Sequence, residues 1–360
     1  MSDSEITGSC LCGKARYSIS VQKASLPLKT YICHCNRCRH VSGSICVTTA
    51  SLPNGVEPPR DLTASLTKYE SSPGFDRYFC SQCGSHMCEH DERFSEWRLT
   101  SGTLDRTGGI IDFAGHIFIP DTLDGGLSPW LPSINSRQLA RYSEFPESAE
   151  IPLDWPNAEH PFTPPTTDLI HAHCDCKGVN LYIAPPSARS AEPNADESDA
   201  LLPHWVRDRP KGQKWWLRDG AKKFMASLCV CDSCRLATGA EVQAWAFVPA
   251  VDIALSPDGK TPFSTDFGTL RMYKHSSRAQ RHFCGTCGAT VFWFGYERPG
   301  VVDVSVGLFD AHEGALVGRL LDWELERVSW REDGMERAPD FVEGLETGLK
   351  GWRGRQHGST

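Results

Sequence analysis

The sequence of 360 residues lacks the features that mark nucleic-acid-binding, exported and membrane proteins. Its 45 acidic residues outnumber its 37 basic ones, and Lys and Arg form no cluster with interleaved aromatic residues, as a nucleic-acid groove requires. The opening MSDSEITGSC has neither a basic start nor an apolar stretch, and the longest apolar region, 244–255, is broken by Pro249 and Asp252. We therefore expect a cytoplasmic protein that binds neither nucleic acid nor membrane; the sequence does not indicate its oligomeric state.

Cysteine, by contrast, is abundant. The chain has 16 cysteines, and because nothing in it signals export, we expect most of them to stay reduced and to bind metal or take part in chemistry. The remaining composition, 40% hydrophobic and 23% charged, is ordinary for a globular protein of about two domains.

The cysteines occur in the same order twice, as CxC, then CxCxxC, then CxxC. This recurrence of seven cysteines indicates a tandem duplication, with insertions in the second copy. The first set is Cys10, Cys12, Cys33, Cys35, Cys38, Cys80 and Cys83, and the second is Cys174, Cys176, Cys229, Cys231, Cys234, Cys284 and Cys287.

The repeat and the composition together predict the domain organisation. A proline-rich connector separates the copies, and a polar stretch after Cys176 followed by a tryptophan-rich one forms the larger insertion. Trp205, Trp215 and Trp216 of this insertion either cover the mouth of a pocket or pack on the domain. The predicted units are a first zinc domain at 1–145, a linker at 146–166, a second zinc domain at 167–338 with its insertion at 185–225, and a helix with a tail at 339–360.

Each copy is predicted to be mainly β. Apolar and polar residues alternate with period two at 15–21, 113–119 and 301–306, as in strands with one buried face. One helix is expected at the end of the chain, where Asp340 can cap a segment whose large apolar residues recur every three or four positions.

The cysteine spacing favours zinc over disulfides. Cysteines one or two residues apart do not close a relaxed disulfide, but on a tight turn both sulfurs can face one tetrahedral metal. Joining the CxC pair of each copy to its CxxC pair gives a four-thiolate site, and a closed site of this kind is structural. We expect these sites to consist of Cys10, Cys12, Cys80 and Cys83 in the first copy and of Cys174, Cys176, Cys284 and Cys287 in the second.

The CxCxxC triplets leave one tetrahedral position unfilled. Zinc held by Cys33, Cys35 and Cys38, or by the second triplet Cys229, Cys231 and Cys234, would be a soft Lewis acid that suits a thiol as its fourth ligand. The chain therefore has places for up to two zinc ions per domain. Alternatively, a histidine, Cys46 or Cys88 completes the triplet and makes that site structural too; otherwise we expect Cys46 and Cys88 to be buried as small apolar residues.

The segments GSCLCGKARY, CHCNRCRHVSGS, RYFCSQCGSH and SGTLDR resemble the glutathione-dependent formaldehyde-activating enzymes and the related centromere protein V group. The resemblance covers about residues 8–131 and, more loosely, 172–330. It implies a β-tent fold of antiparallel sheets in each copy, a structural zinc on the four cysteines and a catalytic zinc on the three. It also implies a carbon-sulfur lyase that joins formaldehyde to glutathione as S-hydroxymethylglutathione.

The two copies depart unequally from this pattern. The first keeps CGSH after Cys80 and GTLD at 102–105, whereas the second reads CGAT and GLFD and has no glycine directly after Cys176. We therefore expect catalysis in the first copy, while the second is a degenerate or regulatory partner that keeps its metal.

Addition of a thiolate to a carbonyl needs a group that protonates the resulting alkoxide. The candidates are His34, His86, Asp105 and His116 in the first copy, and Asp232, His282 and Asp310 in the second. The alternative, favoured for each single histidine, is a satisfied structural role, and for Asp105 it is the cap of a turn. Arg39 and Arg235 directly follow the triplets, and either meets the carboxylate of a glutathione-like substrate or is solvated at the surface.

These observations predict a zinc enzyme that makes or breaks a carbon-sulfur bond in a small-molecule thiol or thiol adduct, with glutathione as a co-substrate. Two alternatives stay open. The zinc could serve as the Lewis acid of an isomerase or cyclase of specialised metabolism, or all the metals could be folding elements of a non-enzymatic interaction scaffold.

Overall fold

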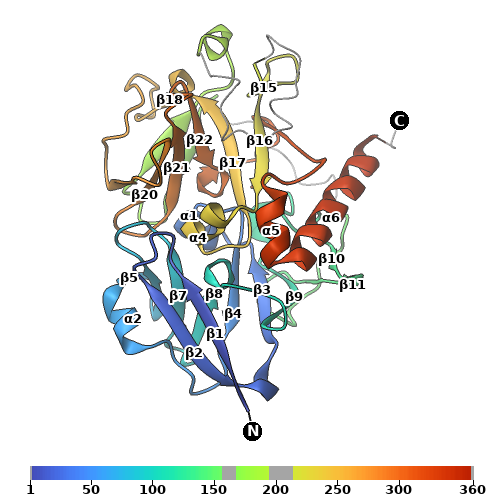
Figure 1. The fold of residues 1–360 in the computed structure, drawn as a ribbon. Coiled ribbons are helices and arrows are strands. Elements are labelled where there is room, and N and C mark those ends of the chain that lie inside the picture. Colours follow the sequence, from blue (N-terminus) through green and yellow to red (C-terminus); the bar gives the residue numbers. More distant parts are fainter. Residues whose placement is uncertain (1, 156–167, 194–213, 358–360) are drawn as a thin grey trace.

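The computed structural model describes residues 2–155, 168–193 and 214–357. Two sheet-rich halves are stacked end to end, the first in blue to green and the second in light green to red (Figure 1). Residues 156–166 of the predicted linker, 194–213 of the predicted insertion with Trp205, and the last three residues lie outside the described part.

The first half is built around one eight-stranded sheet, in the order β12-β9-β3-β4-β8-β7-β6-β5, with a separate β1-β2 hairpin and a small β10-β11 hairpin. Its alternating strand β2 buries Tyr17, Ile19 and Val21 on one face, as the period-two pattern predicts. The strands are β1 Asp3–Ser9, β2 Arg16–Gln22, β3 Leu28–Cys33, β4 Val47–Ser51, β5 Thr67–Ser72, β6 Phe75–Phe79, β7 His86–Asp91, β8 Glu96–Thr100, β9 Ile111–Ile117, β10 Ser133–Ile134, β11 Arg137–Gln138 and β12 Ala140–Arg141.

The second half repeats this plan. Its large sheet runs β15-β16-β17-β22-β21-β20-β19 with β24 added beside β16, and a four-stranded sheet runs β18-β14-β13-β23. The strands are β13 Ile170–His173, β14 Asn180–Ile183, β15 Leu217–Arg218, β16 Lys223–Cys229, β17 Gln243–Pro249, β18 Ile253–Ala254, β19 Leu270–Tyr273, β20 Ala279–Cys284, β21 Thr290–Gly295, β22 Val301–Ser305, β23 Phe309–Asp310 and β24 Leu321–Trp323.

The mainly β prediction is confirmed, and most strand pairs are antiparallel, as expected. Three pairs are parallel: β3 with β9, β9 with β12, and β16 with β24. In each half the parallel strand, β9 or β24, pairs with the strand that ends at the cysteine triplet, β3 or β16. It follows the antiparallel strands of its sheet in the sequence. The parallel strand therefore belongs to the repeated unit, although no sequence pattern marked it.

Five helices are assigned within the described residues, and α1 and α4 are the matching pair that follows the triplet strands. The predicted C-terminal helix is confirmed as α6, which buries Phe341, Leu345 and Leu349. It packs on the first half, where its Phe341 ring lies 5.2 Å from that of Phe113. The helices are α1 Asn36–Ser42, α2 Arg60–Ser65, α4 Asp232–Thr238, α5 Arg331–Arg337 and α6 Pro339–His357.

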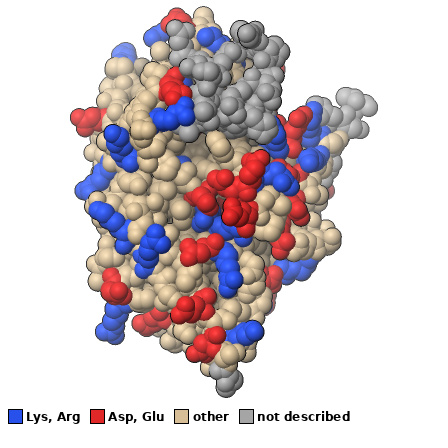
Figure 2. All heavy atoms as spheres, viewed as in Figure 1, with Lys and Arg blue, Asp and Glu red and all other residues tan. Residues whose placement is uncertain are grey.

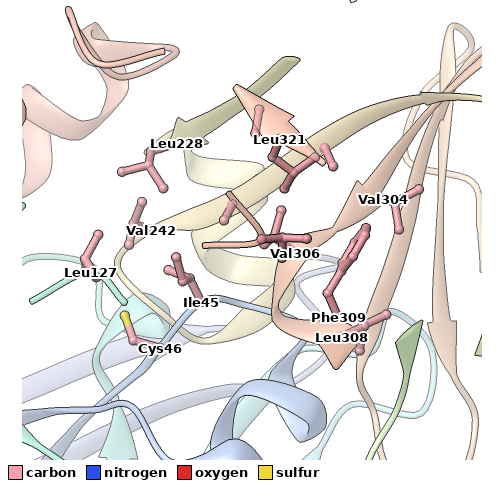
Figure 3. Close-up of a cluster of buried hydrophobic side chains, with 14 of the residues drawn as sticks. Ile45, Cys46, Leu127, Leu228, Val242, Val304, Val306, Leu308, Phe309 and Leu321 are labelled. Atoms are coloured by element: carbon pink, nitrogen blue, oxygen red, sulfur yellow. The ribbon is translucent and has the colours of Figure 1, made fainter. Parts of the chain in front are cut away.

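One buried apolar cluster continues from one half into the other, and each half also has a smaller cluster of its own. Ile45, Cys46 and Leu127 of the first half belong to the same buried cluster as Leu228 and Val306 of the second (Figure 3). Cys46 and Cys88 are buried and lie in apolar clusters, as expected if they act as small apolar residues. Trp215 and Trp216 are also buried, in a cluster of the second half, so packing on the domain is the correct alternative for both.

The halves meet through a pseudo-twofold arrangement of glycines. Gly43 and Gly239 end α1 and α4 with φ of +77° and +75°, and their carbonyls accept hydrogen bonds from the amides of Gly307 and Gly102, at 3.1 and 2.9 Å. A Cβ on Gly43 would lie 2.0 Å from the Thr290 carbonyl oxygen of the other half, and one on Gly239 would lie 2.6 Å from that of His86. Only glycine fits these contacts.

Hydrogen bonds from a buried ion pair of the second half cross the same boundary. Arg337 of α5 donates to the carboxylate of Glu241, at 2.6 Å from Nη1 to Oε2, and also to the backbone carbonyls of Ser101 and Leu104 in the first half. Both partners are buried. Burial of charged groups is tolerated where each donor meets an acceptor, so this network fixes how the halves sit together.

No helix of the described residues is long and apolar enough to cross a membrane. On the face drawn in Figure 2, acidic side chains gather near the middle of the molecule and basic side chains are scattered around them.

Candidate metal centres

The four-sulfur sites form where two tight turns approach each other. The turn after β1 closes with hydrogen bonds from the Cys10 amide to the Ala15 carbonyl and from the Gly13 amide to the Cys10 carbonyl, both 2.9 Å. The turn after β6 repeats this around Cys80, whose carbonyl accepts from the Gly84 amide. In the second half Lys177, with φ of +56°, takes the place of Gly13, so the missing glycine does not prevent the turn.

The sulfur positions fit a tetrahedral metal. Four sulfurs at about 2.3 Å from a zinc ion lie about 3.8 Å apart. Cys12 Sγ lies 3.4 Å from Cys10 Sγ and 3.7 Å from Cys80 Sγ, and Cys176 Sγ lies 3.5 and 3.4 Å from the sulfurs of Cys174 and Cys284. All four sulfurs of each set lie within 4.8 Å of one another. Each set suits a closed, structural zinc site.

The three-sulfur clusters form at the start of α1 and α4. Cys33 ends β3, Cys35 caps α1 by accepting from the Cys38 amide at 3.3 Å, and Cys38 lies in the first helical turn. Cys229, Cys231 and Cys234 repeat this arrangement at α4. The three sulfurs of each cluster lie within 4.8 Å of one another, and among the described residues no fourth His, Cys, Asp or Glu belongs to either group.

A buried arginine faces each three-sulfur cluster. Arg77 Nη2 donates to Cys38 Sγ at 3.3 Å, and Arg281 Nη2 donates to Cys234 Sγ at the same distance. Both arginines precede the first cysteine of the CxxC pair by three positions. Hydrogen bonds from Cys33 and Cys35, together with the charge of Arg77, lower the pKa of Cys38 well below its usual value despite burial. Each arginine thus offsets the negative charge that three thiolates and one divalent ion would carry.

The cavity over the first cluster is large and charged. Its volume is about 500 Å³, and all three cysteines of the cluster line it. Arg77 also donates to the buried carboxylate of Glu89, which lines the cavity as well. Burial raises the pKa of Glu89, against the opposing effect of Arg77. The other charged residues that line the cavity are Arg37, Asp91, Arg93, Glu96 and Arg98.

Most of these charges are paired with each other. Arg93 donates through both Nε and Nη2 to Asp91, at 2.8 Å each, and Arg98 donates to Glu96. Arg37 forms only a long ion pair with Asp175, 3.9 Å from Nη1 to Oδ2, and half of its side chain is exposed. Arg37 is therefore well placed to meet an anionic group of an entering molecule.

The cavity over the second cluster is smaller and aromatic. Its volume is about 270 Å³, and Trp245 donates its indole N–H to Cys234 Sγ at 3.4 Å. Arg298 lies 4.7 Å from the ring centroid of Trp293 and forms a double hydrogen bond with Asp303, at 2.6 and 2.9 Å. These two charges are buried and paired with each other. Phe247 and Trp330 complete the aromatic lining.

The predicted proton-transfer residues of the first copy lie outside the residues that line its cavity. His34 and His116 are buried and joined at 2.9 Å from Nε2 to Nδ1, and His116 Nε2 donates to the Leu131 carbonyl. His86 lies at the boundary between the halves, where burial lowers its pKa to about 3. Asp105 is exposed, and its backbone amide donates to the Thr7 carbonyl.

The two arginines after the triplets join the halves instead of lining a cavity. Arg39 is buried and donates to the Phe309 carbonyl at 3.4 Å, and Arg235 donates to the Gly102 carbonyl at 2.7 Å. Neither lines the cavity of its half, so the geometry gives the predicted contact of Arg39 with a substrate carboxylate no support.

The candidates of the second copy are dispersed. Asp232 pairs with Arg235 at 2.6 Å, and burial lowers the pKa of His282 to about 4. Asp310 lies beside two histidines of β13. None of the three lines the second cavity.

Sequence reasoning missed Arg77 and Glu89, which the structure brings to the first cluster. The usable signal was the repeat itself, since RYFC and RHFC place an arginine at the same position in both copies. Glu89 has no such counterpart, because Trp293 stands at its position in the second half.

Comparison with known proteins agrees with these centres. A family model described as glutathione-dependent formaldehyde-activating enzyme matches residues 5–121 and 218–318, together more than half of the chain. None of the curated proteins compared with the chain matches it significantly. Each matched region contains one cysteine triplet with the arginine that faces it, and four cysteine clusters suited to metal ions occur in the two halves. The chain therefore belongs to the family of glutathione-dependent formaldehyde-activating enzymes and contains two copies of its domain.

Proposed function

We propose that the first half catalyses the formation and cleavage of a carbon-sulfur bond in a thiol-carbonyl adduct such as S-hydroxymethylglutathione. The observation that carries this proposal is the charged cavity of about 500 Å³ that reaches the sulfurs of Cys33, Cys35 and Cys38. In this reaction the thiol sulfur bonds to the carbonyl carbon, and the thiol proton is transferred to the carbonyl oxygen.

The three cysteines are the residues that would hold the metal. Zinc bound there would supply a Lewis acid that favours the thiolate form of an incoming thiol. Arg77 holds Cys38 in place and compensates the charge of the cluster. Arg37, half exposed, contacts a carboxylate of the entering adduct.

Proton transfer falls to Glu89 in this proposal, because it lines the cavity whereas His34, His86, Asp105 and His116 do not. Its raised pKa suits a carboxyl group that gives a proton to the alkoxide oxygen and takes one from the adduct in the reverse direction. Its hydrogen bond with Arg77, which also contacts Cys38, keeps the carboxylate directed toward the cysteine cluster.

The test is the exchange of formaldehyde with glutathione, followed by NMR. Zinc-loaded wild-type protein should accelerate the exchange, and Cys35→Ser should reduce it to the rate without protein. The matched variant Cys231→Ser in the second half should keep most of the acceleration. Glu89→Gln should lower the rate by about 10²-fold or more while the zinc content stays unchanged.

Equal exchange rates with and without the wild-type protein would refute the proposal. Mild chelation then separates the remaining interpretations. If the chelator removes one or two zinc ions and the fold stays intact, the sites are open and the protein catalyses another zinc-dependent reaction. If all four zinc ions resist the chelator equally, the non-enzymatic interaction scaffold is the remaining interpretation.

A further inference from the structure

Two histidines and an aspartate meet on the four-stranded sheet of the second half, in a group that shares no residue with the cysteine clusters although His173 directly precedes Cys174. His171 and His173 alternate along β13, so their side chains lie on one face of the strand, and Asp310 of β23 is the register partner of His171. One ligand atom from each of the three residues lies within 4.8 Å of the others. His173 Nε2 lies 3.8 Å from Asp310 Oδ2.

Hydrogen bonds fix which ring nitrogen of each histidine is free to bind. Asn180 donates its amide N–H to the Lys177 carbonyl at 2.6 Å, which turns its Oδ1 toward His171 Nε2, 3.0 Å away. His173 Nδ1 lies 3.0 Å from the Cys174 carbonyl. These acceptors require a hydrogen on His171 Nε2 and on His173 Nδ1, so the lone pairs of the neutral rings lie on His171 Nδ1 and His173 Nε2.

The rings are also held by stacking. His173 stacks on His40 of α1, with ring centroids 4.2 Å apart and planes within 3°, and His171 stacks on Tyr182 at 4.9 Å and 12°. His40 is itself anchored, because its Nδ1 donates to the His173 carbonyl at 2.7 Å. The imidazoles are therefore oriented before any ligand arrives, whereas the Asp310 side chain is 67% exposed and leaves the cluster open to solvent.

We propose that His171, His173 and Asp310 form a binding site for a divalent transition-metal ion. Two imidazoles and one carboxylate are a ligand set of zinc and of non-haem iron(II). A zinc ion with ligands at about 2.1 Å in tetrahedral geometry needs them about 3.4 Å apart. His173 Nε2 and Asp310 Oδ2, 3.8 Å apart, are close to this spacing, and every ligand atom of the group lies within 4.8 Å of the others. The exposed side leaves coordination positions for water or a small molecule.

The site belongs to the second half only. Thr7 and Ser9 precede Cys10 by the same intervals at which His171 and His173 precede Cys174, and Asp105 occupies the place of Asp310 in the repeated motif. The first half therefore keeps the carboxylate but lacks both imidazoles. This makes Asp105 an internal control for the role of Asp310. The site does not depend on the proposed reaction, because it shares no residue with either cavity.

The test is a titration of the full chain with zinc after its cysteine sites have been filled. Isothermal calorimetry and metal analysis should detect one further zinc equivalent in the wild-type protein. Asp310→Asn and His171→Gln should each weaken that binding by at least about 10-fold, and Asp105→Asn should leave it unchanged. Asn180→Leu, which removes the acceptor for His171 together with the hydrogen bond to the Lys177 carbonyl, should weaken it by about 10- to 100-fold.

A second measurement guards against a misfolded variant. Cobalt(II) added to the zinc-loaded protein should give weak visible bands without the sulfur charge-transfer absorption of a cysteine site, and Asp310→Asn should abolish them while the sulfur-bound zinc is retained. The absence of a further equivalent in the wild-type protein, or its persistence in a variant that lacks both His171 and Asp310, would overturn the proposal.

Discussion

The two halves share one frame and differ in what surrounds the metal. Each places three cysteines at the start of a short helix and directs a buried arginine at the last of them. Over these cysteines the first half has a charged cavity of about 500 Å³. The second half has an aromatic cavity of about 270 Å³, in which an arginine and an aspartate neutralise each other. The comparison teaches that the ligands and their arginine are set by the fold, while the cavity walls can diverge around them.

The largest expected effect tests whether the halves are structurally equal. Cys10→Ser and Cys174→Ser should each lose one zinc equivalent and lower the free energy of unfolding by more than about 4 kcal/mol, because structural zinc contributes directly to folding. Since one core spans both halves, calorimetry should show a single unfolding transition in both variants. Two separated transitions, or an intact half in either variant, would show that the halves are independent.

The next effect tests the pseudo-twofold boundary. Gly43→Ala and Gly239→Ala should each destabilise the protein by about 2–4 kcal/mol, since both positions combine positive φ with a carbonyl of the other half less than 3 Å from a new Cβ. Urea unfolding measures the loss. Gly55→Ala is the control, because φ there is +79° but nothing lies within 4 Å, so only about 1–2 kcal/mol of backbone strain is expected. Equal losses at all three positions would show that the close contact adds nothing.

The smallest effect concerns one boundary position at which the halves differ, His86 in the first and Thr290 in the second. Burial lowers the pKa of His86 to about 3, below its value of 6.5 in the unfolded chain, so the folded state binds fewer protons and loses stability as the pH falls below about 6.5. His86→Thr should remove this contribution.

The measurement is the difference in unfolding free energy between wild type and His86→Thr at several pH values from 7.5 to 5.5. We expect it to be constant above about pH 7 and to shift in favour of the variant at lower pH, by at most about 1.4 kcal/mol per unit. Parallel curves over the whole range would mean that His86 does not titrate differently in the folded protein.

Much of the metal chemistry could be predicted from the sequence, because a metal site built on tight turns is a local feature. The cysteines within each pair and each triplet lie within six residues of each other, and their order repeats, so spacing alone groups these sulfurs. Joining the distant CxC and CxxC pairs into one site needed the further requirement of four ligands for a tetrahedral metal. The period-two pattern at 15–21 and the C-terminal helix are local in the same sense, and both are confirmed. The alternation predicted at 301–306 is wrong, because β22 is buried on both faces, and the helix begins at Pro339, so Asp340 lies in its first turn and does not cap it.

The rest depends on contacts between distant segments. Arg39 follows the triplet in a way that suggests substrate binding, but its guanidinium meets a carbonyl 270 residues away, in a half whose position no pattern reveals. Glu89 looks like any polar residue of a strand, and only folding brings it to Arg77. Asp310 was singled out for proton transfer, yet its neighbours His171 and His173 come from a strand that pairs with it only in three dimensions.

Joining two copies in one chain changes what a substitution can do. In a symmetric pair of identical subunits every altered residue appears twice, so a change that favours one pocket is imposed on the other. Here the glycine contacts at the boundary and the common core pack the two copies together as two subunits of a dimer would pack. Because both copies belong to one chain, a substitution can change a residue in one copy and leave its counterpart unchanged. One pocket can thus keep an ancestral chemistry, and its neighbour is free to acquire a different one without unfolding the pair.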